Sequence, residues 1–428
     1  MYSLLLVIIY IAFISLGLPD SLIGSAWPVM HQDLQVPVSY MGIITMLISG
    51  CTILSSLLSD RLTRRFGTGL VTAVSVFLTA AALFGFSVSG SFPLLCLWAV
   101  PYGLGAGAVD ASLNNYVALH YASRHMSWLH CFWGVGCSVS PYIMSFALTG
   151  HSGWGLGFRI VSILQIVLTA VLFFSLPLWK KAAGSAPRTM STDAAAGVAT
   201  DDAPVAVARS VENTADNSDA ETDSAETSDT AAPFGKALSI RQVLQLKGVP
   251  FVLITFWSYC ALESTTGIWA SSYLVQHRGI DTETAAMFAS LFYLGITFGR
   301  FLCGFVADKL GDRMLIRIGT LTALTGAALI LLPLSANFPA LAGLIIVGLG
   351  CAPIYPSIIH STPDNFGREN SQAVIGIQMA SAYLGSTFMP PVFGLLAAHV
   401  SIGLYPAYLL LFGALMLFMS ERLRRKKP

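Results

Sequence analysis

Apolar residues form long runs along this chain, and short polar segments separate one run from the next. About 20 apolar residues in a helix are enough to cross the roughly 30 Å hydrocarbon layer of a membrane. The pattern therefore predicts an all-α membrane protein with twelve transmembrane helices. Their approximate bounds are 3–28, 38–60, 68–88, 93–119, 127–149, 157–178, 249–276, 284–307, 314–335, 338–360, 371–397 and 401–420.

The composition agrees with a chain that lies in lipid. Of its 428 residues, 55% are hydrophobic and only 11% are charged, whereas soluble domains carry about 25% charged residues. The formal net charge of +1 argues against nucleic acid as a partner. None of the seven cysteines belongs to a CxxC pair, so the sequence indicates neither a disulfide framework nor a zinc site.

One segment between the sixth and seventh predicted helices breaks the apolar pattern. Residues 182–235 are rich in Ala, Ser, Thr and Asp, and hold ten acidic residues against only Arg188 and Arg209. Such a segment cannot bury enough apolar surface to offset the entropy lost on ordering, so we expect it to be disordered. The predicted domains are a six-helix half over 1–180, an acidic low-complexity cytoplasmic linker over 181–247, and a six-helix half with a basic cytoplasmic tail over 248–428.

The basic residues indicate how the chain is oriented. Cytoplasmic segments of membrane proteins carry an excess of Lys and Arg. With both termini in the cytoplasm, 20 of the 23 basic residues fall on that side; Arg159 and Arg278 fall on the other, and Arg300 lies within a predicted span. We therefore expect a multi-pass protein of the cell membrane with cytoplasmic termini.

Three sequence landmarks recur in the two halves at nearly constant spacing, as expected for a duplicated unit. They are a loop aspartate (Asp60 and Asp308, 248 residues apart), the sequence GLG (103–105 and 348–350, 245 apart), and a glycine five residues before a proline (Gly136 and Gly385, 249 apart). Parallel six-helix halves with a binding site between them near the membrane midplane are a transporter architecture.

The loop after the eighth helix resembles the loop signature of the major facilitator superfamily. It reads Gly304-x-x-x-Asp308-Lys309-x-Gly311-x-Arg313, and the first-half counterpart is degraded, with Ser56 and Thr63 where glycines are usual. The resemblance implies a major facilitator fold whose helices 1, 4, 7 and 10 line a central cavity. It also implies that each loop carboxylate faces a helix N-terminus, where a negative charge is favoured, beside basic partners that lock one conformation. A purely topological role for the charges stays open. The predicted conformational-lock residues are Asp60, Arg61, Arg65, Asp308, Lys309 and Arg313.

Three acidic residues lie well inside predicted spans: Asp20 in helix one, Asp110 in helix four and Glu263 in helix seven. Carboxylates are costly at this depth and usually mark a function. Apolar surroundings disfavour the charged form of a carboxyl group, so each can bind a proton from one side and release it to the other when access changes. We predict that all three couple proton movement to transport. The alternative is that they form local hydrogen bonds and only fix helix packing.

The same stretches resemble the fucose–proton symporter group and its sugar-permease relatives. That group has an acid in helix one and another in helix four, with an asparagine four residues after the second, as in Asp20, Asp110 and Asn114. The acid, glycine, tryptophan and tyrosine of helix seven match the relatives as well. The resemblance implies a secondary active transporter that imports a sugar or similar small polar solute by proton symport through alternating access. Candidate substrate-binding residues, chosen for amide groups or aromatic faces on cavity helices, are Asn114, Asn115, Trp269, Tyr355 and Gln378.

No enzymatic or cofactor motif is present in the sequence. The chain has no HExxH, no GxxxxGK[ST] and no nucleophile–base motif, so we expect no catalytic residue, no cofactor, no metal site and no use of ATP. His130, near the start of helix five, is interpreted either as a packed histidine or as a proton relay. The expected partners are the solute, protons and the lipid bilayer, and nothing in the pattern requires more than a monomer.

Two alternatives stay open at this point. The first is proton-driven efflux of drugs or metabolites, although the Gly-Pro-x-x-Gly-Gly pattern typical of antiporters is missing and Ser140 precedes Pro141 in helix five. The second is a membrane sensor that contacts a partner through the acidic linker, whose role the sequence leaves undefined.

Overall fold

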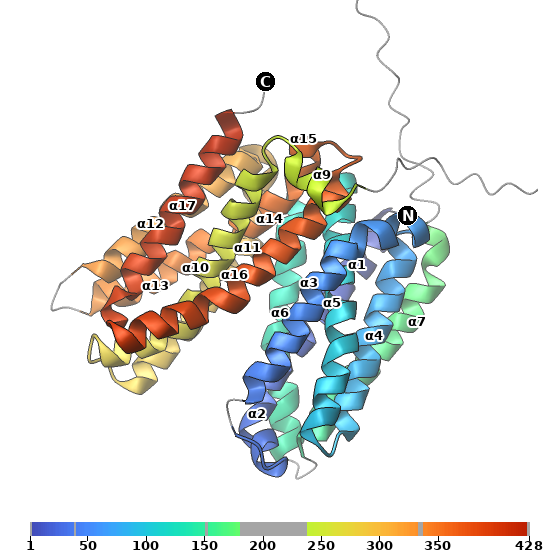
Figure 1. The fold of residues 1–428 in the computed structure, drawn as a ribbon, viewed down its shortest axis with the longest axis horizontal. Coiled ribbons are helices and arrows are strands. Elements are labelled where there is room, and N and C mark those ends of the chain that lie inside the picture. The colour runs from blue at the N-terminus through green and yellow to red at the C-terminus, as the bar shows by residue number, and fades with distance from the viewer. Residues whose placement is uncertain (1, 38–39, 150–152, 180–237, 333–336, 426–428) are drawn as a thin grey trace, which may run out of the picture.

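The computed structural model describes residues 2–37, 40–149, 153–179, 238–332 and 337–425, and these residues form helices without a β-strand (Figure 1). The helices of the first half are α1 (Tyr2–Asp20), α2 (Leu22–Asp33), α3 (Met41–Phe66), α4 (Thr68–Val88), α5 (Phe92–His120), α6 (Ser123–Thr149) and α7 (Trp154–Phe174). Those of the second half are α9 (Ile240–Gln245), α10 (Val249–Gln276), α11 (Thr282–Leu310), α12 (Asp312–Leu331), α13 (Phe338–Cys351), α14 (Ile354–His360), α15 (Thr362–Phe366), α16 (Ser371–His399), η2 (Ile402–Leu404) and α17 (Tyr405–Arg425).

The two halves repeat the same helix pairings. In the first half α1 packs on α6, α3 on α5, and α4 on both α5 and α7. In the second half the corresponding pairs are α10 with α16, α11 with α13, and α12 with both α13 and α17. Contacts between the halves are also reciprocal, since α3 packs on α16 and α6 on α11. The prediction of a duplicated helical fold is confirmed.

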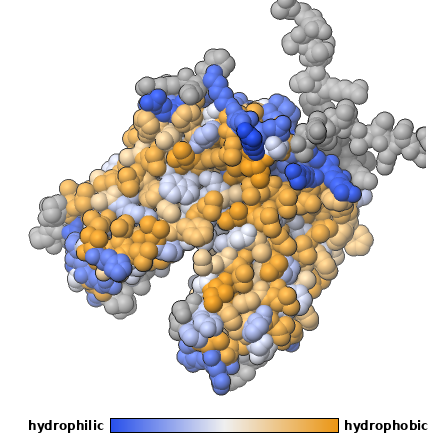
Figure 2. Space-filling view, in the orientation of Figure 1, coloured by the Kyte–Doolittle hydropathy of each residue, from blue (hydrophilic) through white to orange (hydrophobic). Residues whose placement is uncertain are grey.

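The outer surface of the helices is apolar, as a lipid environment requires. Side chains such as Phe146 and Phe174 point away from the protein and are 67% and 86% exposed, and apolar residues cover the sides of both lobes in Figure 2. Ten helical segments of the described residues are long and apolar enough to cross a membrane. Helices α10 and α16 are also long, but they carry more polar residues, several of which border the cavity described below or the contact between the halves.

Two of the spans are broken where the sequence places proline. Pro19 lies one residue before the end of α1, and Ser21 separates α1 from α2. The Ser21 hydroxyl group donates to the carbonyl oxygen of Cys137 at 2.7 Å, which stabilises the break against α6. In the tenth span, Ala352 and Pro353 separate α13 from α14. Both breaks lie beside residues of the cavity, Asp20 and Tyr355.

A close approach of backbones sets the position of α5. A Cβ atom at Gly107 would collide with the carbonyl oxygen of Thr52 on α3, so only glycine allows the two helices to pack this closely. Hydrogen bonds reinforce the contact, because Ser55 and Ser56 on α3 donate to the carbonyl oxygens of Leu104 and Gly107. Asp110, one turn further along α5, is thereby held at a fixed height in the bundle.

The predicted linker falls mostly outside the described residues, because residues 180–237 are among those the structure does not describe. Its last part, 238–247, is described and contains α9, which begins with a capping box between Ser239 and Gln242. Val243 of this short helix is buried. This short helix packs on α10 and α16 of the second half.

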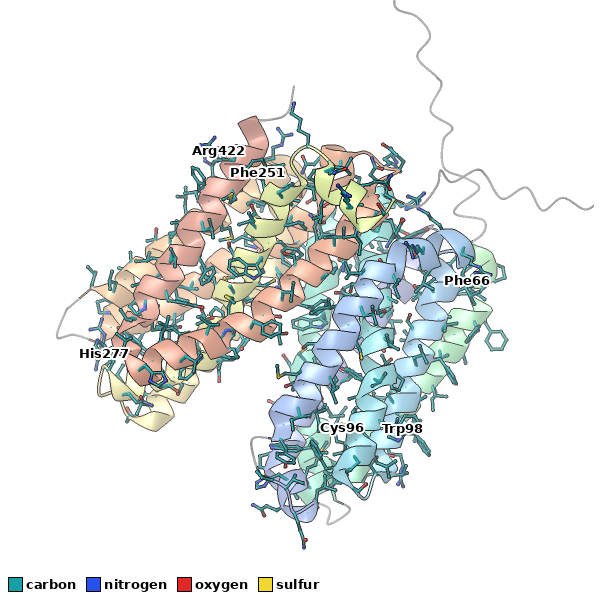
Figure 3. All side chains as sticks on the ribbon, viewed as in Figure 1. Phe66, Cys96, Trp98, Phe251, His277 and Arg422 are labelled. Carbon is teal, nitrogen blue, oxygen red and sulfur yellow. The ribbon has the colours of Figure 1, made fainter. Side chains whose placement is uncertain are left out.

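The two halves meet at the end of the molecule that carries both termini and diverge toward the other end (Figure 1). In the space-filling view a hollow separates the lobes at the end far from the termini (Figure 2). Helices run between these two ends: Phe66 and Phe251 lie toward the terminal end, and Cys96 and His277 toward the open end (Figure 3). The arrangement presents a cavity to one side of the membrane.

Candidate functional site

A cavity of about 380 Å³ lies between the two halves. Helices α1, α3, α4, α5, α6 and α7 form its wall in the first half, and α10, α11, α14 and α16 form it in the second. The polar residues of the wall are Asp20, Ser49, Thr52, Thr79, Tyr102, Asp110, His130, Trp133, Gln165, Glu263, Ser264, Arg300, Tyr355, Tyr383 and Ser386. All three carboxylates that the sequence placed inside spans are therefore brought to one cavity.

Asp20 is the carboxylate at the break between α1 and α2. Its Oδ1 accepts a hydrogen bond from the hydroxyl group of Tyr102 at 3.2 Å, and its Oδ2 accepts one from Trp133 Nε1 at 2.9 Å. Both partners belong to the first half, and the residue itself is exposed to the hollow. A carboxylate with two fixed donors and open access can exchange a proton with the cavity.

Asp110 is held by donors from both halves. Asn114, one turn along α5, donates from Nδ2 to Oδ1 at 2.8 Å, and Tyr383 of α16 donates its hydroxyl proton to Oδ2 at 2.8 Å. The Asn114 amide oxygen in turn lies 3.1 Å from Nε2 of the buried His130. Because the amide nitrogen is used by Asp110, the oxygen accepts and His130 donates. His130 thus orients Asn114, and Asn114 orients Asp110.

Glu263 forms an ion pair with the buried Arg300 of α11. One Arg300 nitrogen, Nη2, lies 3.4 Å from Glu263 Oε1 and 3.4 Å from the hydroxyl oxygen of Tyr259. The guanidinium group also lies over the ring of Trp133, 5.9 Å from its centre. The same tryptophan donates to Asp20. It therefore links the carboxylate of α1, Asp20, to the Arg300 partner of the α10 carboxylate, Glu263.

Of the five predicted substrate-binding residues, only Tyr355 borders the cavity in this conformation. Its ring lies 4.6 Å from that of His130. Asn114 is buried behind Asp110, and Asn115 accepts a 2.6 Å hydrogen bond from Ser371 at the contact between the halves. Trp269 donates to the Pro390 carbonyl oxygen, and Gln378 accepts from Thr362. In this conformation the last three point away from the cavity wall, because each side chain is engaged elsewhere.

Several residues of the wall were not selected from the sequence. Arg300 carried a usable signal, since a charged residue inside a span marks a functional site by default. Trp133, Tyr102 and Tyr383 carried none, because aromatic residues are common in apolar helices and their partners are distant in sequence. Gln165 donates to the Ser15 carbonyl oxygen and accepts from Thr79, a polar network that the hydropathy pattern also concealed. Among the described residues no group of three His, Cys, Asp or Glu side chains is arranged to hold a metal ion.

The end of the molecule with the termini is closed by polar contacts between the halves. Asp308 pairs with Arg124, and its Oδ2 lies 2.5 Å from Nε of that arginine. The Oδ1 atom of Asp308 accepts a 3.1 Å hydrogen bond from the backbone N–H of Arg124. Helix α6 begins at Ser123, so this carboxylate lies at the positive end of a helix of the other half. Lys309 and Arg313, the basic residues of the same signature, are exposed.

A second contact at this end involves Asp312, the residue that precedes Arg313. Its Oδ1 accepts from the Ser123 hydroxyl group at 2.5 Å, and its Oδ2 lies 2.6 Å from His360 Nδ1. The other ring nitrogen of His360 lies 3.1 Å from the Tyr121 carbonyl oxygen. Since that nitrogen donates to a carbonyl, a proton must also lie between Nδ1 and the carboxylate for both contacts to form. The sequence signature did not identify this network.

The corresponding aspartate of the first half lies within the last turns of α3 and pairs with a different arginine from the two selected by sequence. Asp60 pairs with Arg64 at 2.8 Å, and Arg64 also donates to the Glu369 carbonyl oxygen of the second half at 2.7 Å. Arg65 lies against the ring of Phe66. An arginine one turn after the aspartate on the same helix face reaches it directly, whereas neighbouring positions point elsewhere.

Comparison with known proteins agrees with this architecture. The family model described as Major Facilitator Superfamily matches residues 9–289 and, in a second match, 251–427. Bypass of stop codon protein 6 of Saccharomyces cerevisiae is 23% identical over 413 residues, which cover 92% of this chain and 77% of the yeast protein.

Two solved structures show the same fold across nearly the whole chain. The fucose:proton symporter FucP of E. coli in the outward conformation has a TM-score of 0.71 and 12% identity, with 98% of each chain covered. The proton:xylose symporter XylE bound to 6-bromo-6-deoxy-D-glucose has a TM-score of 0.72 and 12% identity, covering 99% of this chain and 95% of its own. From the family match and the two six-helix halves, this chain belongs to the Major Facilitator Superfamily and is a multi-pass membrane transporter, not an enzyme.

Proposed function

We propose that the protein imports a sugar or similar small polar solute together with protons, by alternating access of the cavity between its halves. The observation that carries this proposal is the gathering of Asp20, Asp110 and Glu263 in one cavity wall. A proton-coupled carrier needs acidic groups that can be reached from one side at a time. The hollow gives access from one end, while the ion pair and hydrogen bonds described above close the other.

In this proposal Asp110 is the carboxylate whose hydrogen bonds, and with them its affinity for a proton, change when the protein changes conformation. Its contact with Tyr383 joins α5 of the first half to α16 of the second. When the halves rock apart at the terminal end, this hydrogen bond has to change. The hydrogen bonds that a carboxylate accepts affect how tightly it binds a proton, so the affinity of Asp110 for a proton depends on which side the cavity faces.

Asp20 and Glu263 occupy complementary positions. Asp20 receives its donors from within the first half, and Glu263 is paired with Arg300 within the second. Each half therefore carries one acid whose partners move with it, whereas Asp110 has one donor in each half. A solute bound among the three is close to every group that exchanges a proton.

The solute in this proposal binds against the aromatic residues of the wall. Trp133 and Tyr355 come from opposite halves and offer ring faces and polar tips, which suit the C–H faces and hydroxyl groups of a sugar. Asn114 holds Asp110 rather than the solute in this conformation. Asn115, Trp269 and Gln378 stay candidates for the opposite conformation, in which the contacts of α10 and α16 differ.

The proposed orientation places both termini in the cytoplasm of a cell membrane, because twenty of the 23 basic residues lie on that side. The conformation described here then faces outward. Solute would enter from outside with protons already on the acids, and both would leave after the cytoplasmic end opens.

The experiment is a measurement of external pH in lightly buffered cells that express the protein, while hexoses, deoxyhexoses and disaccharides are added one at a time. Alkalinisation by one sugar in cells with the wild-type protein, absent with Asp110→Asn at equal expression, supports proton symport of that class. Acidification of the medium when a solute is added outside would indicate proton–solute antiport instead, because solute that enters through an antiporter drives protons out. No pH change with any member of the panel would contradict the proposal.

A further inference from the structure

Arg300 is a buried cation whose hydrogen bonds are incomplete. It lies within α11, is 4% exposed and borders the central cavity. Its contacts with Glu263 and Tyr259 both use Nη2 and are both 3.4 Å long. Its Nε is buried and has no hydrogen-bond partner among the described residues.

This pairing is weak for a guanidinium group in such a place. Charge-assisted hydrogen bonds from arginine are normally about 2.7–2.9 Å long and often come in pairs to one carboxylate. A buried charged donor without an acceptor is costlier than a neutral one. The guanidinium group of Arg300 is planar, and pairs of its five N–H donors can bind both oxygens of a carboxylate. Glu263 contacts only one of its nitrogens, Nη2.

Arg300 borders the cavity and is paired with one acidic side chain, that of Glu263. From α10 it is faced by Glu263, Tyr259 and Cys260, from α13 by Cys351, and from α14 by Tyr355. From α6 it is faced by Trp133, His130, Cys131 and Cys137. Glu263 is therefore the acidic partner supplied by these neighbouring helices. The Trp133 ring lies against the guanidinium group of Arg300, and its indole N–H donates to Asp20. A group bound at Arg300 is therefore separated from the Asp20 carboxylate by one side chain, that of Trp133.

We propose that Arg300 is the specificity-determining residue of the cavity and that the transported solute carries a carboxylate, as a sugar acid does. This inference rests on the proposed function and narrows its solute class. The solute carboxylate takes the free arms of the guanidinium and displaces Glu263, which then accepts a proton from the cavity. The pair formed by the solute and Arg300 is neutral, so the occupied site can change sides without an unpaired charge.

A neutral sugar satisfies this site less well. Its hydroxyl groups can accept from Arg300, but they are weaker acceptors than a carboxylate and do not match the fork with two parallel oxygens. An anionic solute also requires Asp20 and Asp110 to be protonated while it is bound, because two further negative charges would repel it. Solute entry is then tied to proton loading, as symport demands. A cavity of about 380 Å³ lies within the size range of small-molecule sites.

The test uses the purified full-length protein and compares D-galacturonate and D-glucuronate with D-galactose and D-glucose. Binding is followed by calorimetry and by the fluorescence of the native tryptophans, and proton uptake is followed in proteoliposomes. We expect a uronate to bind at least ten-fold more tightly than its neutral hexose. Arg300→Lys should reduce that preference at least ten-fold, and Arg300→Gln should abolish uronate binding. Arg159→Gln, which changes an exposed arginine of α7, should alter neither.

Glu263→Gln separates a solute site from a purely structural ion pair. If Glu263 competes with the solute for Arg300, the variant binds the uronate as tightly as the wild type or more tightly. If Arg300 serves only to neutralise Glu263, the double variant Glu263→Gln/Arg300→Gln regains the wild-type binding and preference. Should Arg300→Gln fail to fold, the folded Arg300→Lys and Glu263→Gln proteins still decide the matter.

The outcomes distinguish this inference from the proposed function. Proton uptake with a neutral hexose, with its preference unchanged in Arg300→Lys, overturns the carboxylate assignment and leaves proton–sugar symport standing. Uronate binding and transport without proton uptake supports the carboxylate assignment and contradicts symport. Neither binding nor proton uptake with either class overturns both.

Discussion

The hydroxyl group of Tyr383 donates a 2.8 Å hydrogen bond to Asp110, and this bond joins the two halves of the protein inside the cavity. Asp110 belongs to α5 and Tyr383 to α16, helices that lie 273 residues apart at these positions. A hydrogen bond to a carboxylate is among the stronger kinds, worth about 1.5–3 kcal/mol. The position of α16 therefore bears directly on the charge of Asp110.

Tyr383→Phe removes this donor and keeps the ring. We expect solute-driven proton uptake to fall roughly ten-fold or more, because the charged form of Asp110 loses about 1.5–3 kcal/mol of stabilisation in this conformation. Initial rates of proton uptake in proteoliposomes measure the effect. Tyr142→Phe is the matched control, since Tyr142 lies on α6 and is 78% exposed. Equal rates in Tyr383→Phe and wild type would show that the bond has no part in coupling.

Asp110→Asn replaces the proposed proton-binding group with an amide of the same shape. We expect accumulation against a gradient to be lost, while expression and some exchange of solute across the membrane persist, because exchange requires no net proton movement. Counterflow with labelled solute and gradient-driven uptake, measured on the same vesicles, separate the two activities. Loss of exchange together with accumulation would assign Asp110 to solute binding or to folding instead.

The ion pair between Arg124 and Asp308 predicts a modest shift of conformation. Both side chains are partly exposed, at 50% and 31%, and exposed pairs contribute about 0.2–1 kcal/mol. Arg124→Ala should therefore change the ratio of the two conformations by at most about five-fold, away from the one that is closed at the terminal end. Arg317→Ala is the control, because its pair with Glu421 has similar exposure but lies within one half.

Spin labels at the open end report that ratio. Cys96 and His277→Cys lie on different lobes near this end (Figure 3), and the six other cysteines are replaced by serine. The distribution of distances between the labels should move toward shorter values in Arg124→Ala and stay unchanged in Arg317→Ala. Asp312→Asn should produce a larger shift than Arg124→Ala, because Asp312 accepts a hydrogen bond from Ser123 of the other half and its side chain is only 11% exposed. The reverse order would contradict the role given to Asp312.

Gly376 predicts a steric effect on the same equilibrium. A Cβ atom there would lie 2.5 Å from the Ser56 carbonyl oxygen of the other half, and backbone cannot move aside as a side chain can. Gly376→Ala should disfavour the described conformation and shorten the label distances. Gly50→Ala, where a Cβ meets nothing within 4 Å, should leave the distances unchanged and stabilise α3 slightly. Normal label distances in Gly376→Ala would show that the contact is loose.

The fold was predictable because it depends on features that single residues display. Runs of apolar residues determine the spans, and the recurrence of Asp60 as Asp308 reveals the duplication. Asp20, Asp110 and Glu263 were identifiable for the same reason, since a carboxylate inside an apolar run is conspicuous whatever its partners are. The match with the superfamily confirms the architecture.

The composition of the cavity wall was harder to predict because it depends on helix rotation. Glu263 and Trp269 are six residues apart on α10, which places them about 120° apart around the helix axis, so both cannot face one cavity. Tyr383 and Gln378 are about 140° apart on α16 for the same reason. A sequence motif shows that such residues share a helix, but only the packing of α10 and α16 decides which of them reaches the cavity.

The measurement that tests the central claim most directly is solute accumulation by proteoliposomes under an imposed inward proton gradient, with wild-type protein and Asp110→Asn side by side. The account predicts accumulation above the external concentration in the wild type, its collapse when a protonophore is added, and none in the variant despite preserved counterflow. Accumulation by Asp110→Asn to the wild-type level would contradict it.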